Sequence, residues 1–329
     1  LGRDICFRLD AALDAGRRKN QGGPTSRGWF AGGTTGSLAA AAAAGKVLGL
    51  NAPQMATAFG IAVAGAGGVR RNFGTMAKAL QTGNAARNGV SAAVLAQKGF
   101  TADQTILEAP MGFASALCLE GECDWDALTK DLGKYFHMEK MPPIKRFPTC
   151  TPAHRPIEGL LALRQQHGFT AADVESVESD FHERSLARTD PQEAIAGPNS
   201  MPFILAIALL DGKVTLEQFT DEKIHDPRVR STMAKIRHRA NERQPGQAEP
   251  PDRITVTLKN GVAHTIEVVE RTTYTSSSDI HAKFFDCATL ALSRARADEL
   301  AGLADRLENV DDVNALMSCM NGNDLKNST

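Results

Sequence analysis

Small and apolar residues dominate the chain up to about residue 135, in runs with helical spacing. These runs predict helices over 37–50, 52–66 and 83–98, ending near Gly49, at the glycine-rich turn of Gly67 and Gly68, and at Gly99. Alanine fills 39–44 and recurs through 85–96, which lets neighbouring helices approach closely. Lysine and arginine interrupt the segments, so the pattern favours a compact water-soluble bundle over helices packed inside a membrane.

The pattern changes near Met141, where a proline-rich extended segment begins. A helix over 157–167 and a strand over 174–181 follow, and two alternating segments flank Asn260-Gly261, a strong signal for a β-hairpin. A polar loop at 239–251 precedes the hairpin, and helical periodicity returns after 276–278 and runs to Met320. We therefore predict a mainly α fold with an α+β insertion, with a large helical domain and a smaller domain. The predicted parts are 1–140, 141–273 and 274–329.

Composition narrows the functional classes. The 329 residues include 37 basic and 38 acidic side chains, a balance that argues against a nucleic-acid partner. Apolar runs are too short to span a bilayer, and the charged, amphipathic opening does not resemble a signal peptide. The six cysteines are scattered and lack zinc spacing, as expected for reduced thiols in a cytoplasmic protein. The chain begins at Leu1 within a predicted helix, so we expect that a preceding portion is missing.

A first candidate site lies at 67–89, where cations flank the start of a predicted helix. Arg70 and Arg71 lie in a turn, Gly74-Thr75 offers free backbone N–H groups, and Lys78 follows on the same helical side as Thr75. Such an arrangement favours a bound carboxylate or phosphate. The alternative is a solvated basic turn with a capping threonine.

A second candidate site lies at 144–159, at the predicted domain boundary. Lys145 is on an extended segment from which it can point into a cleft, and His154 can exchange protons near neutral pH. We expect His154 and Arg155 to precede a helix that begins at Pro156. The alternative for His154 is a packing or capping role. Cys150 has no nearby base in the sequence and is not expected to be a nucleophile.

Together these stretches resemble the MmgE/PrpD family. The resemblance rests on RGWFAGGTTGSLAAAAAAGKVLGLN, RRNFGTMAKALQTGNAARNGVSAAVLAQKGFTA, ILEAPMGF, KRFPTCTPAHRPIEG, SMPFILAIALLDGKVT and LENVDDVNALM, in the family's order from about residue 27 to 318. It implies a large helical domain with a smaller α+β lid, a homodimer, and no metal or organic cofactor. It also implies a missing N-terminal portion with an Asp/His-rich segment.

The family's motifs place the site residues. The G-T-x-T-K motif falls on Gly74–Lys78 with Ala77 at the second threonine, the K-x-[YF]-P lysine on Lys145, and the T-H-R histidine on His154. The resemblance therefore implies Lys78, Lys145 and His154 as catalytic residues lining a cleft between helical domain and lid. Phe30 and Gln81 replace family histidines, and Phe203 replaces a frequent tyrosine. The expected substrate-binding residues are Arg70, Thr75, Gln81, Phe30, Ser200 and Phe203.

The resemblance implies a lyase for a small di- or tricarboxylic acid. The expected reaction is that of a 2-methylcitrate dehydratase, with proton abstraction next to a carboxylate followed by elimination. Decarboxylation uses the same kind of site. Two alternatives stay open from the sequence: an epimerase or isomerase of a small dicarboxylic acid, and an impaired member that serves as an anion-binding or dimerisation scaffold. The lost histidines favour the latter.

Overall fold

The first part of the chain is helical. The computed structural model describes residues 1–15, 23–137, 144–181, 188–240, 251–269 and 276–320. The helices of the first part surround one apolar cluster that includes Leu9, Leu38 and Phe113. They are α1 (Gly2–Leu13), α3 (Thr35–Val47), α4 (Ala52–Ala64), α5 (Met76–Gln97), α6 (Phe113–Leu117) and α7 (Trp125–Thr129). Among the described residues, no helix is both long and apolar enough to cross a bilayer.

Small residues let the helices of this part pack closely, as the sequence predicts. A Cβ added to Gly89 of α5 would lie 2.4 Å from the Ala40 Cβ of α3 and 2.5 Å from the Ala41 nitrogen. Distances below 3.0 Å leave no room for a side chain, so glycine is required at this crossing. Two predicted boundaries are wrong: α4 ends at Ala64 with Gly65 as its C-cap, and α5 begins at Met76.

A buried ion pair fixes α1 to the end of the helical part. Arg8 is fully buried, and its Nε donates to the Asp4 carboxylate at 2.9 Å. The same guanidinium donates to the carbonyl oxygens of Lys130 at 2.6 Å and Tyr135 at 2.8 Å. Since an uncompensated buried charge is strongly unfavourable, this network holds the segment before residue 138 in place.

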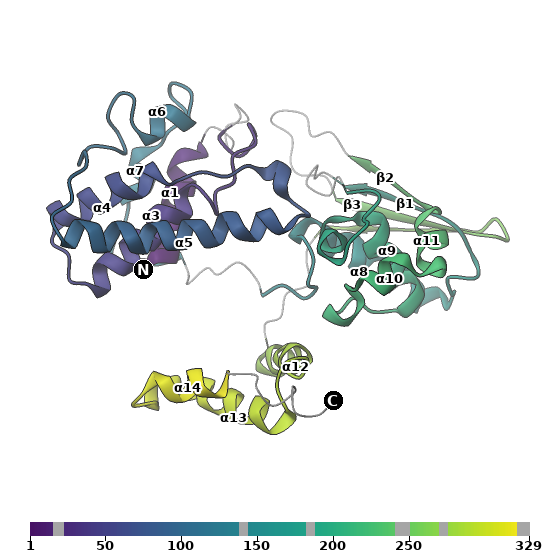
Figure 1. Cartoon of the computed structure of the whole chain (residues 1–329). Coiled ribbons are helices and arrows are strands. Elements are labelled where there is room, and N and C mark those ends of the chain that lie inside the picture. The colour runs from purple at the N-terminus through teal and green to yellow at the C-terminus, as the bar shows by residue number, and fades with distance from the viewer. Residues whose placement is uncertain (16–22, 138–143, 182–187, 241–250, 270–275, 321–329) are drawn as a thin grey trace.

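The middle part is an α+β unit, shown in green in Figure 1. Its sheet has the order β2-β1-β3-β4, with β1 and β2 parallel and the other pairs antiparallel. The strands are β1 (Val174–Phe181), β2 (Ile236–Ala240), β3 (Asp252–Leu258) and β4 (Ala263–Val268). The predicted strand over 174–181 and the hairpin at Asn260-Gly261 are confirmed. Most of the predicted polar loop, residues 241–250, lies outside the described residues.

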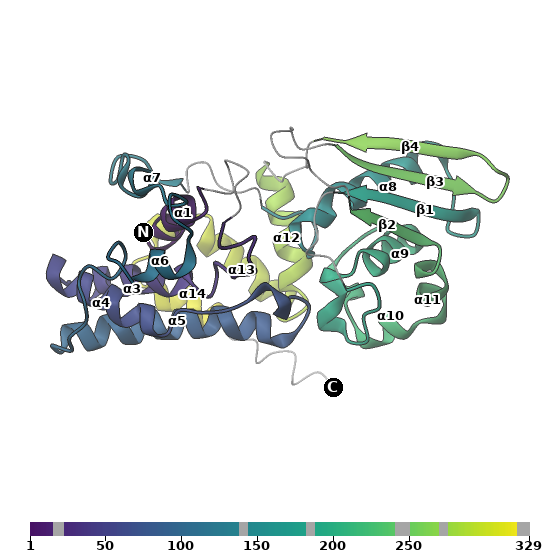
Figure 2. The same cartoon turned by 90° about the horizontal axis from the view of Figure 1, so that it is seen from above.

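Helices pack against this sheet, as Figure 2 shows from above. They are α8 (His154–His167) and α9 (Met201–Asp211), while α11 (Pro227–Met233) packs against α9 and α10 (Asp221–His225) packs against α11. A Cβ added to Gly159 of α8 would lie 3.1 Å from Ile254 of β3 and 3.1 Å from Val268 of β4, so α8 lies directly on the hairpin. The core of this unit is the buried apolar side of α8, α9 and the strands.

The last part of the chain is helical again, as predicted. It contains α12 (Ser277–Ala288), α13 (Arg294–Ala304) and α14 (Val313–Cys319), which share a small cluster around Leu292, Leu300 and Cys319. Seen from above, α12 lies between the helical part and the α+β unit (Figure 2), and in Figure 1 it lies below the junction of the two. The order of helical, α+β and helical segments is confirmed. That the last segment belongs to the first helical domain stays a prediction.

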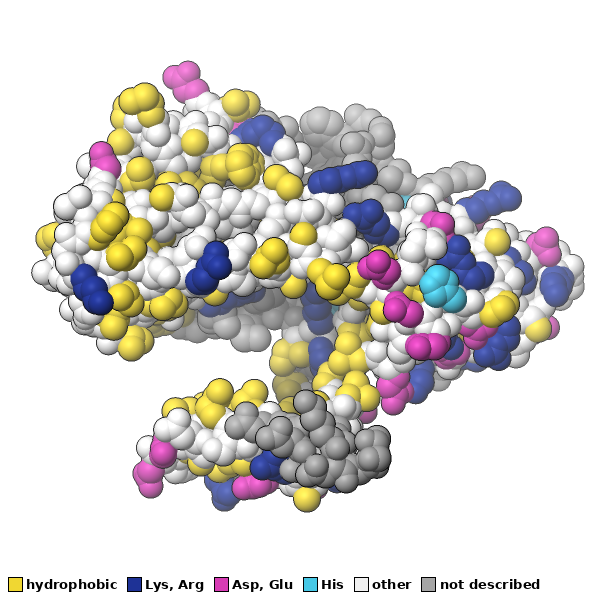
Figure 3. All heavy atoms as spheres, viewed as in Figure 1, with side chains coloured by type: hydrophobic (Ala, Val, Ile, Leu, Met, Phe, Trp, Pro, Cys, Tyr) yellow, Lys and Arg dark blue, Asp and Glu magenta, His cyan; other side chains and the backbone are white. Residues whose placement is uncertain are grey.

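The surface differs between the two larger parts. Figure 3 shows mostly hydrophobic and uncharged side chains on one face of the helical part, whereas charged side chains gather over the α+β unit. Met76 and Leu80 lie one turn apart on α5 and are 73% and 61% exposed. Exposed apolar residues in neighbouring turns are typical of a surface that makes contacts.

Candidate functional site

The first candidate segment is a tight turn that leads into α5. Arg70–Asn72 form the short 3₁₀ helix η1, Gly74 has a φ of +79°, and Thr75 is the N-cap of α5. Gln81, in the second turn of α5, accepts from the Val69 nitrogen at 2.7 Å and from the Asn72 side chain at 3.1 Å, and donates to the Val69 oxygen at 3.3 Å. The side-chain amide of Gln81 therefore holds the turn against the helix through its hydrogen bonds to Val69 and Asn72.

Phe73 is the centre of this turn. The Phe30 ring contacts it edge-on at a centroid distance of 5.2 Å. The Lys78 Nζ lies 4.4 Å and the Arg70 Cζ 5.6 Å from its ring centroid. Cations over an aromatic face are stabilised by the ring's negative charge without losing their own. The structure thus gathers Phe30, Arg70 and Lys78, as the sequence predicted, around a residue that the sequence analysis did not select.

The second candidate segment brings Lys145 beside this turn. The Lys145 Nζ donates to the Thr149 oxygen at 3.0 Å. The residue is exposed, yet the protein around the ammonium group removes enough water that desolvation lowers the pKa of Lys145. The positive charges of Lys78 and Lys283 lower this pKa further, whereas Cys150 acts in the opposite direction. The structure therefore places the two predicted lysines, Lys78 and Lys145, within electrostatic reach of each other.

His154 occupies a different environment. The predicted helix start at Pro156 is wrong, because α8 begins at His154, and Pro156 fits its first turn, where a missing N–H is tolerated. His154 is 3% exposed, and its ring contacts Phe147 edge-on at 5.4 Å. Arg155 pairs with Asp252 at 2.9 Å and joins α8 to β3. His154 thus belongs to the buried side of the segment, behind Phe147.

The remaining predicted residues support α9. Ser200 is the N-cap of α9 and its hydroxyl accepts from the Phe203 nitrogen at 3.4 Å. Phe203 is fully buried, with its ring 5.8 Å from that of Phe219. Thr75, by contrast, lies at the start of α5, where its hydroxyl donates to the Asn72 oxygen at 2.8 Å. In the closed core around α9, Phe203 provides packing, and its position relative to a substrate stays a prediction.

Arg188, from the α+β unit, contacts the first candidate segment, and no local sequence pattern marks it. Its Nε donates to the Phe73 oxygen at 3.2 Å. Asn199, just before α9, lies against Gly74 and accepts a hydrogen bond from the Cys150 thiol at 3.3 Å. A continuous path of contacts therefore runs from the Phe73 turn through Asn199 to Cys150 and the Lys145 segment.

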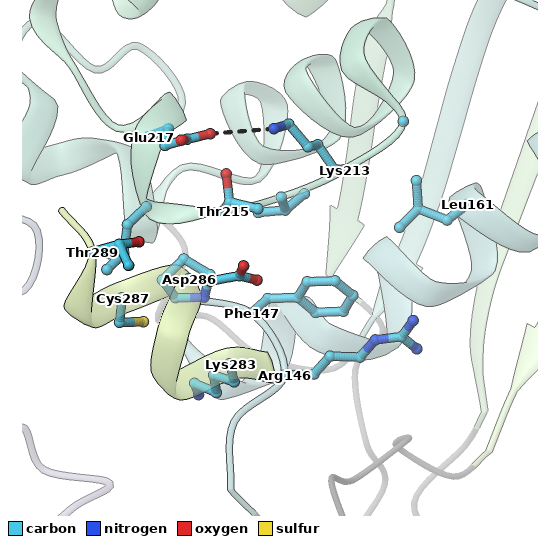
Figure 4. A pocket seen from close by; sticks show the side chains of 14 residues that line it. Arg146, Phe147, Leu161, Lys213, Thr215, Glu217, Lys283, Asp286, Cys287 and Thr289 are labelled. Atoms are coloured by element: carbon cyan, nitrogen blue, oxygen red, sulfur yellow. Dashed lines mark hydrogen bonds and ion pairs between the residues drawn. The ribbon is translucent and has the colours of Figure 1, made fainter. Parts of the chain in front are cut away.

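A pocket of about 530 Å³ lies on the other side of Phe147, as Figure 4 shows. One wall is α12, which contributes Lys283, Asp286 and Cys287. The opposite wall is the loop after α9, where Lys213 and Glu217 form an ion pair at 3.2 Å. Arg146 and Phe147 line the pocket from the segment that carries Lys145. Within the described part of the chain, no group of three or more His, Cys, Asp or Glu side chains is placed to hold a metal ion.

Comparison with known proteins identifies both halves of the chain. Residues 2–126 match the model of the MmgE/PrpD N-terminal domain, and residues 147–309 match that of the C-terminal domain. Similar curated proteins include the cis-aconitate decarboxylase of Aspergillus terreus, 27% identical over 321 residues, which cover 90% of this chain and 65% of that protein. The enzymes of the same name from Mus musculus and Homo sapiens are each 26% identical over 314 residues, covering 87% of this chain. The match covers 61% and 62% of those two enzymes, so this chain spans just under two thirds of the length of these relatives.

Proposed function

Because this chain belongs to the MmgE/PrpD family, we propose that it is a lyase for a small di- or tricarboxylic acid. The observation that carries the proposal is that Lys78 lies within electrostatic reach of Lys145 and helps to lower its pKa, while Arg188 of the α+β unit bonds the Phe73 turn beside Lys78. Two nearby cations favour binding of a ligand that carries several carboxylates, since each added negative charge gains from both. The same charges stabilise the enolate-like intermediate that forms next to a carboxylate.

We assign the proton-transfer role first to Lys145. Its lowered pKa increases the fraction of neutral amine near neutral pH, and only the neutral amine can accept a proton. In dehydration, the Lys145 amine would take a proton from carbon, and the Lys145 ammonium so formed would give that proton to the departing hydroxyl, which leaves as water. In decarboxylation, the electrons of the broken C–C bond would stay on carbon, which would then take a proton from the Lys145 ammonium. His154 takes second place as an acid or base because it lies behind Phe147.

The names of the relatives favour decarboxylation. The three similar proteins described above are all cis-aconitate decarboxylases, so we propose an unsaturated tricarboxylic acid as substrate and CO₂ as one product. This replaces the 2-methylcitrate dehydratase reaction as the first choice, and dehydration becomes an outcome of the test. We further propose a homodimer, which the exposed apolar residues of α5 support. Light scattering at micromolar concentration should give twice the chain mass of 35.1 kDa.

Proton NMR in deuterium oxide tests the reaction. The full chain is incubated with cis-aconitate, and separately with 2-methylcitrate, while products are followed. Decarboxylation gives CO₂ and a product with deuterium on carbon, dehydration gives a new alkene, and exchange without elimination indicates an epimerase. Absence of any change with either acid contradicts the lyase proposal.

A matched pair of variants on α5 links the reaction to the site. Lys78→Met removes the cation beside Phe73, whereas Lys98→Met removes one from the exposed end of the same helix. Loss of one charge-assisted contact to a carboxylate should weaken binding about tenfold or more, since such contacts contribute about 1.5–3 kcal/mol. Lys98→Met should bind and react as the unmodified chain does. Equal effects of both substitutions would remove Lys78 from the site.

A further inference from the structure

We propose that Lys283, on α12, is a positioning residue for Lys145: it holds the main chain at Lys145 and places a fixed positive charge beside the Lys145 amine. The first observation is direct contact, because the Lys283 Nζ donates a hydrogen bond to the carbonyl oxygen of Lys145. The two residues are 138 positions apart in the sequence, so this contact exists only when α12 is docked at the junction. The catalytic meaning of this role rests on the proposed function.

The second observation is the face that α12 presents. Lys283, Asp286 and Cys287 are spaced at i, i+3 and i+4, so they project from one side of the helix. All three line the 530 Å³ pocket together with Arg146 and Phe147, the two residues that follow Lys145 (Figure 4). The helix therefore lies beside the segment that carries Lys145, with Lys283 in direct contact with it.

The consequence for Lys145 follows from its neighbours. The charged and titratable groups that act on its amine are Lys78 from α5, Lys283 from α12 and Cys150 from its own segment. The hydrogen bond from Lys283 engages the main-chain oxygen of Lys145 and leaves the Lys145 side chain free to bond the Thr149 oxygen. A fixed cation at this position disfavours a second positive charge nearby, so docking of α12 favours the neutral Lys145 amine. The last helices of the chain would thus control the proton-transfer group.

Acylation of individual lysines measures this effect without any substrate. The full chain is treated with a trace of acetic anhydride over a range of pH, and modification of Lys145 is quantified by peptide mass spectrometry. Lys259, in the distant hairpin turn between β3 and β4, is the internal reference. Only the neutral amine reacts, so the rate at a fixed pH reports its fraction. Three variants are compared: Lys283→Met, which keeps length without charge; Lys283→Arg, which keeps charge; and Lys213→Met, which changes a lysine of the same pocket that is paired with Glu217.

We expect Lys283→Met to slow acylation of Lys145 about threefold relative to Lys259, the effect of half a pKa unit on the neutral fraction. Lys283→Arg and Lys213→Met should leave the ratio close to that of the unmodified chain. An unchanged ratio in Lys283→Met overturns the inference, and so does an equal slowing in Lys283→Arg or Lys213→Met. Thermal melting identifies a misfolded variant, in which case Lys283→Gln takes the place of Lys283→Met with the same expected result.

The outcome is separable from that of the proposed function. A shifted Lys145 profile in a chain that converts no polycarboxylate supports the positioning role and contradicts the lyase. Turnover of a polycarboxylate together with an unshifted Lys145 profile in Lys283→Met supports the lyase and contradicts the positioning role. If the chain turns over, the pH at which the rate changes with Lys145 protonation should move upward in Lys283→Met, because loss of a neighbouring cation raises the pKa of Lys145. KM should change little, because the binding cation Lys78 is unaltered.

Discussion

Gly74 offers the sharpest test of the contact between the helical part and the α+β unit. It has a φ of +79°, and a Cβ added to it would lie 3.0 Å from the Arg188 Cγ, 3.2 Å from the Arg188 Nε and 3.5 Å from the Asn199 Cβ. Gly49, at the end of α3, has a similar φ of +70° but would meet nothing within 4 Å. Replacing each with alanine imposes a comparable backbone penalty, and only Gly74→Ala also disturbs the contact.

The expected losses of stability follow from the backbone penalty, which both substitutions share, and from the disturbed contact with Arg188, which only Gly74→Ala has. A left-handed conformation costs an L-residue about 1–2 kcal/mol, and this applies to both substitutions. Gly74→Ala must also displace Arg188, whose Nε donates to the Phe73 oxygen at 3.2 Å. Loss of that hydrogen bond adds about 0.5–1.5 kcal/mol. We therefore expect Gly74→Ala to lower the free energy of unfolding by about 1 kcal/mol more than Gly49→Ala does.

The assay combines stability with binding. Urea unfolding followed by circular dichroism gives the two free energies, and calorimetry gives the affinity for a tricarboxylate such as cis-aconitate. Gly74→Ala should weaken this affinity about tenfold, equivalent to about 1.4 kcal/mol, because the Phe73 turn carries Lys78 toward Lys145. Gly49→Ala should leave affinity unchanged. Equal destabilisation by the two substitutions, together with equal affinity, would refute the reasoning that Gly74 is required by the contact with Arg188.

Three further predictions follow from single side chains. Lys145→Ala should abolish turnover in the NMR assay while melting stays nearly unchanged, since the residue is exposed and its hydrogen bond to the Thr149 oxygen contributes only about 0.5–1.5 kcal/mol. A large loss of stability would mean a structural role. Asp4→Asn should lower the free energy of unfolding by about 3–5 kcal/mol, measured in urea, because it leaves the fully buried Arg8 without its counter-charge; a loss below 1 kcal/mol contradicts this. Burial raises the pKa of Asp10, so between the ordinary carboxyl pKa and the raised one the folded chain binds more protons than the unfolded chain, and stability falls as pH rises. Asp10→Asn keeps an acceptor for Thr35 and should flatten this pH dependence, and an unchanged slope in melting experiments would exclude Asp10 as its source.

Local patterns predicted much of the fold. The hairpin at Asn260-Gly261 and the strand over 174–181 were placed correctly because turn residues and alternation are local signals. The start of α5 was placed too late, at Gly83, since glycine in a helix interior costs about 1 kcal/mol relative to alanine. The structure begins the helix at Met76, where Gln81 bonds Val69 and Asn72 of the preceding turn, contacts that the local pattern does not contain.

In the candidate site, too, local motifs pointed to some residues, whereas others depend on contacts between distant parts of the sequence. Lys78 and Lys145 were identified from short motifs, and the structure brings both to the same junction. Arg188 and Lys283 were missed, because each acts through a main-chain oxygen more than a hundred positions away in the sequence. A carbonyl oxygen is present at every residue, so no side-chain pattern marks it as a partner. His154 shows the converse limit: its motif predicted a cleft residue, whereas its burial behind Phe147 depends on the packing of α8.

The way in which these cations are held explains why the junction suits an anionic ligand. Arg8 and Arg155, which fasten structural elements, are paired with the carboxylates of Asp4 and Asp252. At the junction, by contrast, the hydrogen bonds described above run to neutral acceptors. Arg188, Lys145 and Lys283 donate to carbonyl oxygens, and Lys78 lies over the ring of Phe73. A carbonyl or a ring orients a cation without cancelling its charge, and the positive field therefore remains available to carboxylates that enter from solvent. Each cation also lowers the pKa of its neighbours, so the same positive charges that would attract a carboxylate increase the fraction of neutral Lys145 amine.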